Sequence, residues 1–222
     1  MCAAGAPTSA GPCVVAEALG SGWTLIKEGL PGRTTVHDDP IEGIHMNGKT
    51  YLQPCLASHW PLDVIAVMLG TNDLTRKFSL NPTEIALGVG ALLFTIKSLV
   101  PPWTNAPKLL LICPAPAISS GWQAPLFDGA DGKARQMAPL YKWQADRYGA
   151  AFFDAGTVVK VSPLDGVTIR EPGASRGPSG DRSTACGRRR SVTVRRRCRR
   201  RNARPPPKRA LLLFDRVRRG AA

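Results

Sequence analysis

Three short, almost continuous apolar runs constrain the fold of this 222-residue chain more than any other feature. Leu62 to Leu69 is interrupted only by Asp63, and Leu109 to Cys113 and Ala151 to Asp154 are similar runs. Strands that are apolar on both faces are typical of parallel sheets covered by helices on both sides. With a shorter strand expected at Thr24–Lys27, these runs predict a mostly parallel sheet.

Helical patterns lie between the predicted strands. Val14–Leu19 is expected to end a first helix, and Asn81–Leu99 starts with a capping residue followed by proline and stops before two further prolines. Lys133–Tyr148 has helical spacing, with Pro139 either kinking this helix or marking its start. Alternation of strands and helices predicts an α/β fold: a three-layer α/β/α sandwich around a flavodoxin-like parallel sheet.

The charge of the chain is concentrated at one end. Residues 1–170 hold 13 basic and 13 acidic residues, whereas residues 171–222 hold 17 basic and 3 acidic residues and so carry the whole net charge of +14. The basic segment contains 16 arginines and a single aromatic residue, Phe214. We therefore expect a disordered N-terminus at 1–11, a domain at 12–168 and a disordered arginine-rich tail at 169–222.

Composition argues against several classes of protein. The longest apolar stretch, Ile85 to Ile96, is too short to cross a membrane, and the first eleven residues lack the charge and apolar core of a signal peptide. The six cysteines include no Cys-x-x-Cys pair, so spacing supports neither a metal site nor a disulfide framework. We expect a cytoplasmic protein without cofactor or metal, and the sequence leaves its oligomeric state open.

Polar residues gather where the predicted strands end. Glu28–Thr35, Gly70–Asp73 and Leu164–Val167 each follow a predicted strand, and ligands of such sheets bind beyond the carboxyl ends of the strands. Each segment by itself is an ordinary turn composition. Their joint occurrence, in order and at successive strand ends, favours a binding site.

Taken together, these segments resemble the SGNH (GDSL-type) hydrolase family, especially its small arylesterase and acyltransferase branch. The resemblance spans roughly Val14 to Val167 and is carried by Glu28–Thr35, Asp38-Asp39-Pro40, Asn47-Gly48, Tyr51-Leu52, Leu69–Asp73, Ile85–Gly88, Phe153–Gly156 and Asp165–Val167. It implies ester hydrolysis or acyl transfer through a serine acyl-enzyme, with a small ester as the substrate.

The resemblance also implies roles for single residues. Gly32 matches the glycine whose backbone N–H binds the oxyanion, Asn72 matches the asparagine whose amide does the same, and Asp165 matches the carboxylate that orients the catalytic histidine. Trp122 and Phe127 are expected to line an apolar wall of the pocket, with core packing as an equally weighted alternative for both.

Two departures from the family pattern stand out. The chain contains no Gly-Asp-Ser, which would place the nucleophile at the end of the first strand, and Thr168 stands where the pattern asks for the catalytic histidine. The histidines present, at positions 37, 45 and 59, are expected to be structural or surface residues. We therefore expect the chain to be catalytically impaired.

Because the Gly-Asp-Ser block is missing, we expect the domain at 12–168 to be a truncated SGNH hydrolase domain. Without the interior first strand, Thr24–Lys27 and Leu62–Leu69 would lose their shared neighbour, and a marginally stable, aggregation-prone product is expected. Arginine-rich sequence with alanine, glycine and proline is also typical of GC-rich DNA read out of frame, which is one hypothesis for both ends of the chain.

Two other functions remain open on the sequence. Runs at 188–190, 195–197 and 199–201 contain only arginine, which would allow nonspecific binding of nucleic acid or another polyanion. A pseudoenzyme that binds acyl esters or a partner chain is the third interpretation.

Overall fold

The computed structural model describes residues 10–167 and 206–216. Five parallel strands form one sheet in the order β1-β5-β2-β3-β4. Their bounds are β1 Trp23–Pro31, β2 Val64–Met68, β3 Lys108–Cys113, β4 Ala151–Asp154 and β5 Lys208–Arg216. The predicted α/β fold with a parallel sheet is confirmed.

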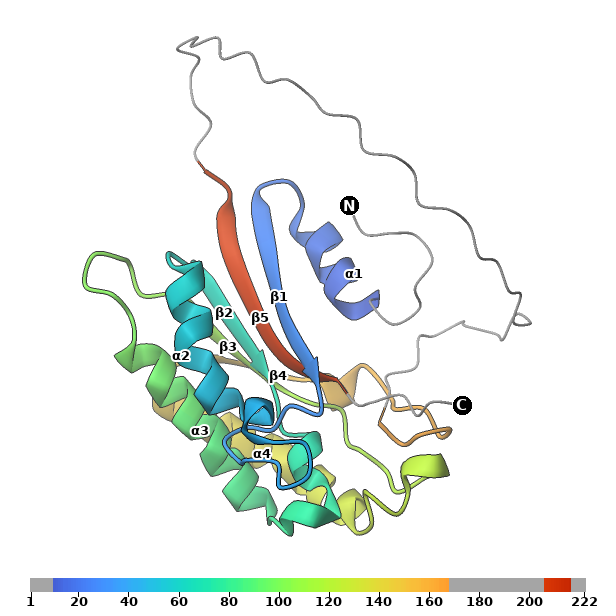
Figure 1. Ribbon diagram of the computed structural model, residues 1–222. Helices are drawn as coiled ribbons and strands as arrows, with labels where there is room; N and C mark the ends of the chain where they lie inside the picture. The colour runs from blue at the N-terminus through green and yellow to red at the C-terminus, as the bar shows by residue number, and fades with distance from the viewer. Residues whose placement is uncertain (1–9, 168–205, 217–222) are drawn as a thin grey trace, which may run out of the picture. The chain divides into compact units, whose positions relative to one another are not determined.

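Helices cover the sheet on two sides. Figure 1 shows α1 (Ala10–Leu19) beside β1, and α2 (Gly48–His59), α3 (Pro82–Ser98) and α4 (Ala130–Tyr148) on the other side of the sheet. Within the second layer, α2 packs against α3 and α3 against α4. This is the three-layer arrangement that the alternating pattern predicts.

The core lies between the sheet and the layer formed by α2, α3 and α4. Alternate residues of neighbouring strands point into it, so that Ile65, Val67, Leu111, Leu211 and Leu213 are all fully buried. They pack in one cluster with apolar side chains of the helices, including fully buried Leu92, Leu93 and Tyr141. Alternation of this kind follows from the two-residue repeat of a strand.

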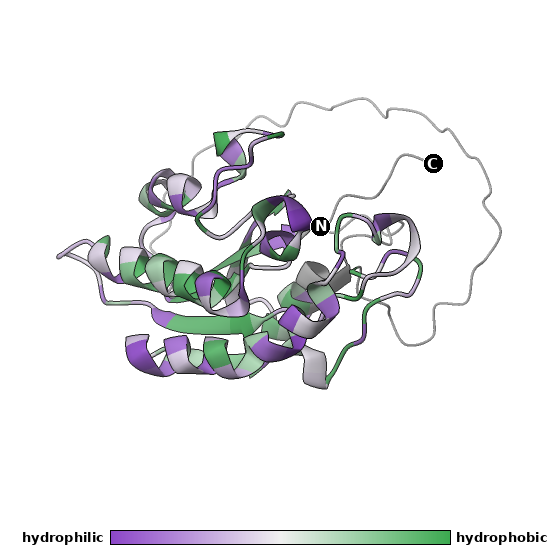
Figure 2. Cartoon of the chain, turned by 90° about the horizontal axis from the view of Figure 1, so that it is seen from below, coloured by the Kyte–Doolittle hydropathy of each residue, from purple (hydrophilic) through white to green (hydrophobic). Residues whose placement is uncertain are grey.

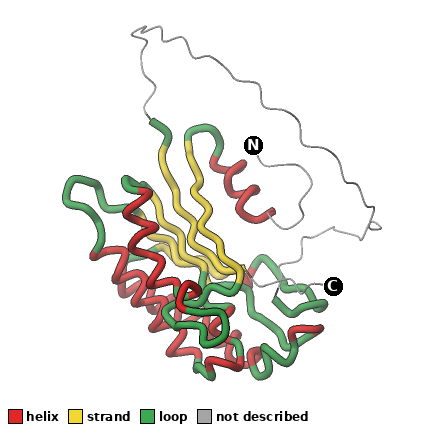
Figure 3. Tube along the Cα trace, viewed as in Figure 1, coloured by secondary structure: helices red, strands yellow, loops and turns green. Residues whose placement is uncertain are grey.

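The interior position of the sheet is filled by β5, from the C-terminal end of the chain (Figure 3). Leu211 pairs with Ile26 of β1 on one side and with Ile65 of β2 on the other. The expectation of a missing interior strand is therefore wrong, and with it the reason to expect a marginally stable product.

The expected structureless tail is likewise corrected for Lys208–Arg216. Residues 210–214 are all buried, which is the behaviour of a strand that is covered on both faces. The rest of the expected tail at 168–205, including the three arginine runs, lies outside the described residues, as do residues 1–9 of the expected N-terminus.

Local signals explain most of the helices. The start of α3 carries a complete capping box, in which Asn81 and Glu84 each accept a hydrogen bond from the other's backbone N–H. α4 begins at Ala130 and continues through Pro139, so this proline does not mark the start of the helix. The sequence analysis missed α2, although Asn47 caps it through the N–H groups of Lys49 and Thr50.

Figure 2 shows hydrophilic and apolar residues interleaved along the helices, as expected when one face of each is buried. Among the described residues, none of the helices combines the length and apolarity needed to cross a bilayer.

Candidate functional site

The loops that follow β1 and β2 are bonded to each other at the carboxyl edge of the sheet. Asn72 Nδ2 donates a hydrogen bond of 2.9 Å to the carbonyl oxygen of Arg33. The carboxylate of Asp73 accepts from the backbone N–H of Thr35 at 3.0 Å and from its hydroxyl at 2.5 Å. These contacts hold the two loops in one arrangement because both acceptor groups are buried.

The hydrogen bond from Asn72 also joins the two loops that carry the predicted oxyanion donors, Gly32 and Asn72. Gly32 directly precedes Arg33, whose carbonyl holds the amide of Asn72. The backbone of Gly32 has φ +88°, a conformation that favours glycine, and a Cβ there would lie 3.2 Å from the Glu42 carboxylate. The neighbouring strand end uses Gly70 at φ +119°, where a Cβ would collide with the Tyr141 hydroxyl at 2.0 Å.

The end of β5 is joined to the same loops through Asp215. Its Oδ2 accepts a hydrogen bond of 2.9 Å from the backbone N–H of Thr71. Burial, with a smaller contribution from the neighbouring Asp73 carboxylate, raises the pKa of Asp215 to about 7, against the hydrogen bond from Thr71 that lowers it. Burial also raises the pKa of Asp73, against the hydrogen bonds from Thr35 that lower it.

The end of the interior strand, where the family carries its nucleophile, has a different sequence in this chain. The family's Gly-Asp-Ser is expected at the end of the interior strand, and β5 reaches that place with Phe214-Asp215-Arg216. The last residues of this interior strand are therefore an aspartate and an arginine, and no serine follows Asp215 in the sequence. This segment was not predicted as a strand, because its flanks are rich in arginine, although residues 210–214 form an apolar run like that of β3.

Asp165 lies in another loop, after β4, close to the end of the described range 10–167. Its Oδ1 accepts a hydrogen bond of 3.2 Å from the backbone N–H of Val167, and the next residue, Gly166, accepts one from the N–H of Ile118 at 2.8 Å. Its role as the orienting carboxylate stays a prediction. Thr168, which takes the place of the expected histidine, lies outside the described residues.

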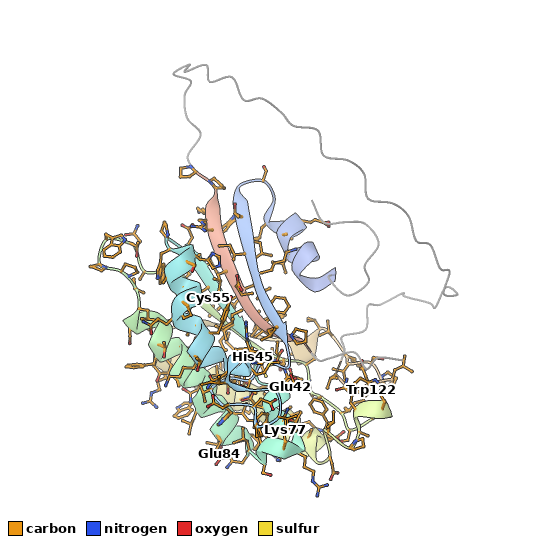
Figure 4. All side chains as sticks on the ribbon, viewed as in Figure 1. Glu42, His45, Cys55, Lys77, Glu84 and Trp122 are labelled. Carbon is orange, nitrogen blue, oxygen red and sulfur yellow. The ribbon has the colours of Figure 1, made fainter. Side chains whose placement is uncertain are left out.

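The two aromatic residues predicted to line the pocket have different surroundings. Phe127 is 1 % exposed and belongs to the main apolar cluster, which matches the core-packing alternative. Trp122 is 52 % exposed and lies on the 3-10 helix η4 (Gly121–Gln123), well to one side of α2 in Figure 4. A pocket role for either residue therefore remains untested.

The three histidines are distributed over different environments. His45 is exposed (Figure 4), and the ring of His37 packs near Phe78 with centroids 6.2 Å apart. His59 Nε2 lies 3.0 Å from a carboxylate oxygen of Glu28. Glu28 and His59, with Cys55, also form a group of three side chains that could hold a metal ion.

The chain is similar to a known family and to several solved structures. A family model described as the GDSL-like Lipase/Acylhydrolase family matches residues 3–173. Among solved structures, a carbohydrate acetylesterase from Sinorhizobium meliloti is 38% identical, with a TM-score of 0.68 over 71% of this chain and 75% of the other.

A native aryl esterase from M. smegmatis is 36% identical, with a TM-score of 0.68 over 72% of this chain and 76% of its own. A second carbohydrate acetylesterase family member from Sinorhizobium meliloti is 34% identical, with a TM-score of 0.68 over 71% and 76% of the two chains. The search of curated proteins found no match.

Proposed function

Because this chain belongs to the GDSL-like lipase/acylhydrolase family, we propose that it binds small carboxylic esters at the Gly32–Asn72 site without forming an acyl-enzyme. Acetyl and aryl esters are the proposed substrate class, since the similar structures are named as a carbohydrate acetylesterase and an aryl esterase.

The hydrogen bond from Asn72 to Arg33 carries the proposal. It holds Asn72 Nδ2 at 2.9 Å from the carbonyl oxygen of Arg33, the residue that follows Gly32. In the proposal, the second N–H of this amide and the backbone N–H of Gly32 donate to the carbonyl oxygen of the ester. Such donors stabilise the negative charge that develops on an ester oxygen, and removing one costs about 2.7–4 kcal/mol in enzymes that use it.

The groups that would attack the bound ester are replaced in the sequence. Arg216 follows Asp215 where the family has serine, and a guanidinium stays protonated and cannot act as a nucleophile. Thr168 replaces the base, and a hydroxyl does not take up a proton near neutral pH. Hydrolysis and acyl transfer both begin from the same acyl-serine, so both activities are lost together.

Two measurements on the purified full chain test this proposal. Hydrolysis of nitrophenyl acetate should be no faster than with Asn72→Ala, whereas saturation-transfer NMR should detect bound phenyl acetate, more weakly in Asn72→Ala. Asn105→Ala, in an exposed loop, is the matched control and should bind as the wild type does. Rapid hydrolysis that Asn72→Ala abolishes would overturn the loss of catalysis, and absence of binding would overturn the retained site.

Nonspecific binding of polyanions through the arginine runs is the alternative from the sequence. No contact among residues 10–167 and 206–216 favours it, so it stays a sequence-based prediction.

A further inference from the structure

Three side chains with metal-binding atoms meet between β1 and α2, outside the ester site. Glu28 comes from β1, and Cys55 and His59 come from α2, one helical turn apart. One ligand atom of each residue lies within 4.8 Å of the other two. Residues at i and i+4 share one face of a helix, so α2 presents the thiol and the imidazole to the same point; Figure 4 marks Cys55 on this helix.

The donor set fits a zinc-type cation. Thiolate sulfur, imidazole nitrogen and carboxylate oxygen are the three ligand types of Zn²⁺, at about 2.3, 2.0–2.1 and 2.0–2.2 Å. In a tetrahedral site these distances place neighbouring donor atoms about 3.5 Å apart. His59 Nε2 and Glu28 Oε1 are now 3.0 Å apart, so small side-chain movements suffice to admit an ion between them.

The surroundings would support an ion while leaving it accessible. Cys55 is 3 % exposed, whereas the side chains of Glu28 and His59 are 21% and 26% exposed, which gives an ion a path in and a water molecule room as fourth ligand. Tyr51 donates a hydrogen bond of 2.5 Å to Glu28 Oε2 and so orients the carboxylate with Oε1 toward His59. Outer-shell hydrogen bonds of this kind are characteristic of metal sites.

Charge in the cluster is mixed. The Arg33 guanidinium lies 4.3 Å from the centre of the Tyr51 ring and donates to the backbone carbonyl of Glu28 at 2.8 Å. It weakens the attraction for a cation, but it is held by the backbone and the ring. Deprotonated Cys55 and Glu28 together balance the two charges of the ion. Burial raises the pKa of the Cys55 thiol to about 11, so an entering ion displaces a proton from the sulfur.

We propose that Glu28, Cys55 and His59 form a binding site for Zn²⁺ or a similar divalent cation, which links β1 to α2. The ion has a structural role in this proposal: it ties β1, the strand that leads into the Gly32 loop, to α2. Sequence spacing conceals the site because Glu28 and His59 are 31 positions apart.

Cobalt titration of the full chain under reducing conditions tests the site directly, because a thiolate bound to Co²⁺ gives a charge-transfer band in the near ultraviolet. We expect one equivalent of Co²⁺ to produce this band and Zn²⁺ to displace it. Cys55→Ser should abolish the band, and His59→Gln should weaken binding at least tenfold. His45→Gln, at an exposed histidine, is the matched control and should leave the titration unchanged.

Thermal melts guard against a variant that fails to fold. Zn²⁺ should raise the melting temperature of the wild type and of His45→Gln but not that of Cys55→Ser, whose metal-free melt should remain cooperative. Absence of a band and of a Zn²⁺-dependent shift in the wild type would overturn the proposal. A band that survives Cys55→Ser would also overturn it, since the ion would then bind at other cysteines.

Discussion

The carboxyl edge of the sheet has two parts that differ in what they retain. The loops after β1 and β2 carry the predicted oxyanion residues Gly32 and Asn72 and are joined by hydrogen bonds from Asn72 and to Asp73. The end of β5 keeps the position of the strand and the bond from Thr71 to Asp215, but it continues into Arg216 instead of serine. The two loops are joined by hydrogen bonds, whereas the strand end lacks the serine that the proposed loss of catalysis concerns.

Introducing the serine and the histidine that the family pattern requires should have the largest effect, an increase in ester hydrolysis. The double variant Arg216→Ser/Thr168→His supplies a hydroxyl after Asp215 and an imidazole three residues after Asp165. We expect nitrophenyl acetate hydrolysis to rise at least 100-fold, since a positioned base contributes about 10²–10⁴-fold. Adding Asn72→Ala should lower this rate about 10²–10³-fold.

The variant Arg216→Ala/Thr168→Ala is the control and should remain inactive. If the double variant stays inactive although its melting temperature equals that of the wild type, the side chains at positions 168 and 216 do not lie close enough to act together.

Truncating the core of β5 should have the next largest effect. Leu211 is fully buried between β1 and β2, so Leu211→Ala should lower the free energy of unfolding by about 2–5 kcal/mol. Leu164→Ala, at a residue that is 62% exposed, should change it by under about 0.5 kcal/mol. Urea unfolding measures the free energy of unfolding of both variants. Equal losses would contradict the interior position of β5 in the sheet.

The buried acid at the end of β5 should make stability depend on pH. Because burial raises the pKa of Asp215 to about 7 from its usual 3.8, the folded state favours the protonated acid. Its stabilising contribution is full below pH 4 and is lost as the pH rises toward 7, at roughly 1.4 kcal/mol per unit of pKa difference.

Asp215→Asn should flatten this part of the stability profile, measured by urea unfolding between pH 4 and pH 8. Asp131 is the control with the opposite pKa shift, because hydrogen bonds from Ser119 lower its pKa. Asp131→Asn should therefore lower the free energy of unfolding at pH values above the usual pKa of an aspartate, and not at pH values below it. A profile for Asp215→Asn that follows the wild type would contradict the buried position of this acid.

Removing a hydrogen bond between Thr35 and Asp73, which joins the loops after β1 and β2, should have the smallest of these effects. Thr35→Val keeps the size of the side chain but removes the hydroxyl that donates to buried Asp73, and we expect a loss of about 1–3 kcal/mol in the free energy of unfolding. Thr157→Val removes an exposed hydroxyl from its bond to the carbonyl of Asp154 and should cost under about 0.5 kcal/mol. Equal losses in Thr35→Val and Thr157→Val would show that the hydrogen bond to Asp73 does not stabilise the fold more than an exposed one does.

The sequence predicted the layers of the fold better than the contents of the site. Apolar runs and caps carry local information, and they located β2, β3, β4 and α3 to within a few residues. The interior strand was missed because parallel pairing joins Leu211 to Ile26 and Ile65 across most of the chain, and no local pattern records such a pairing.

The candidate site divides in the same way. Gly32 and Asn72 could be named because each stands within a strand-end motif that resembles the family's, and the hydrogen bond from Asn72 to Arg33 joins their loops. Arg33, Asp73 and Asp215 were given no role, since burial and hydrogen bonding between distant segments decide what they do. The cluster of Glu28, Cys55 and His59 escaped notice for the same reason.

Labelling with a fluorophosphonate, followed by intact mass measurement, tests most directly whether this family member has lost its nucleophile. The reagent forms a covalent adduct with activated serines and leaves ordinary hydroxyls unmodified. We predict that the wild-type chain stays unlabelled while Arg216→Ser/Thr168→His gains one adduct at residue 216. A stoichiometric adduct on a serine of the wild-type chain would contradict the account.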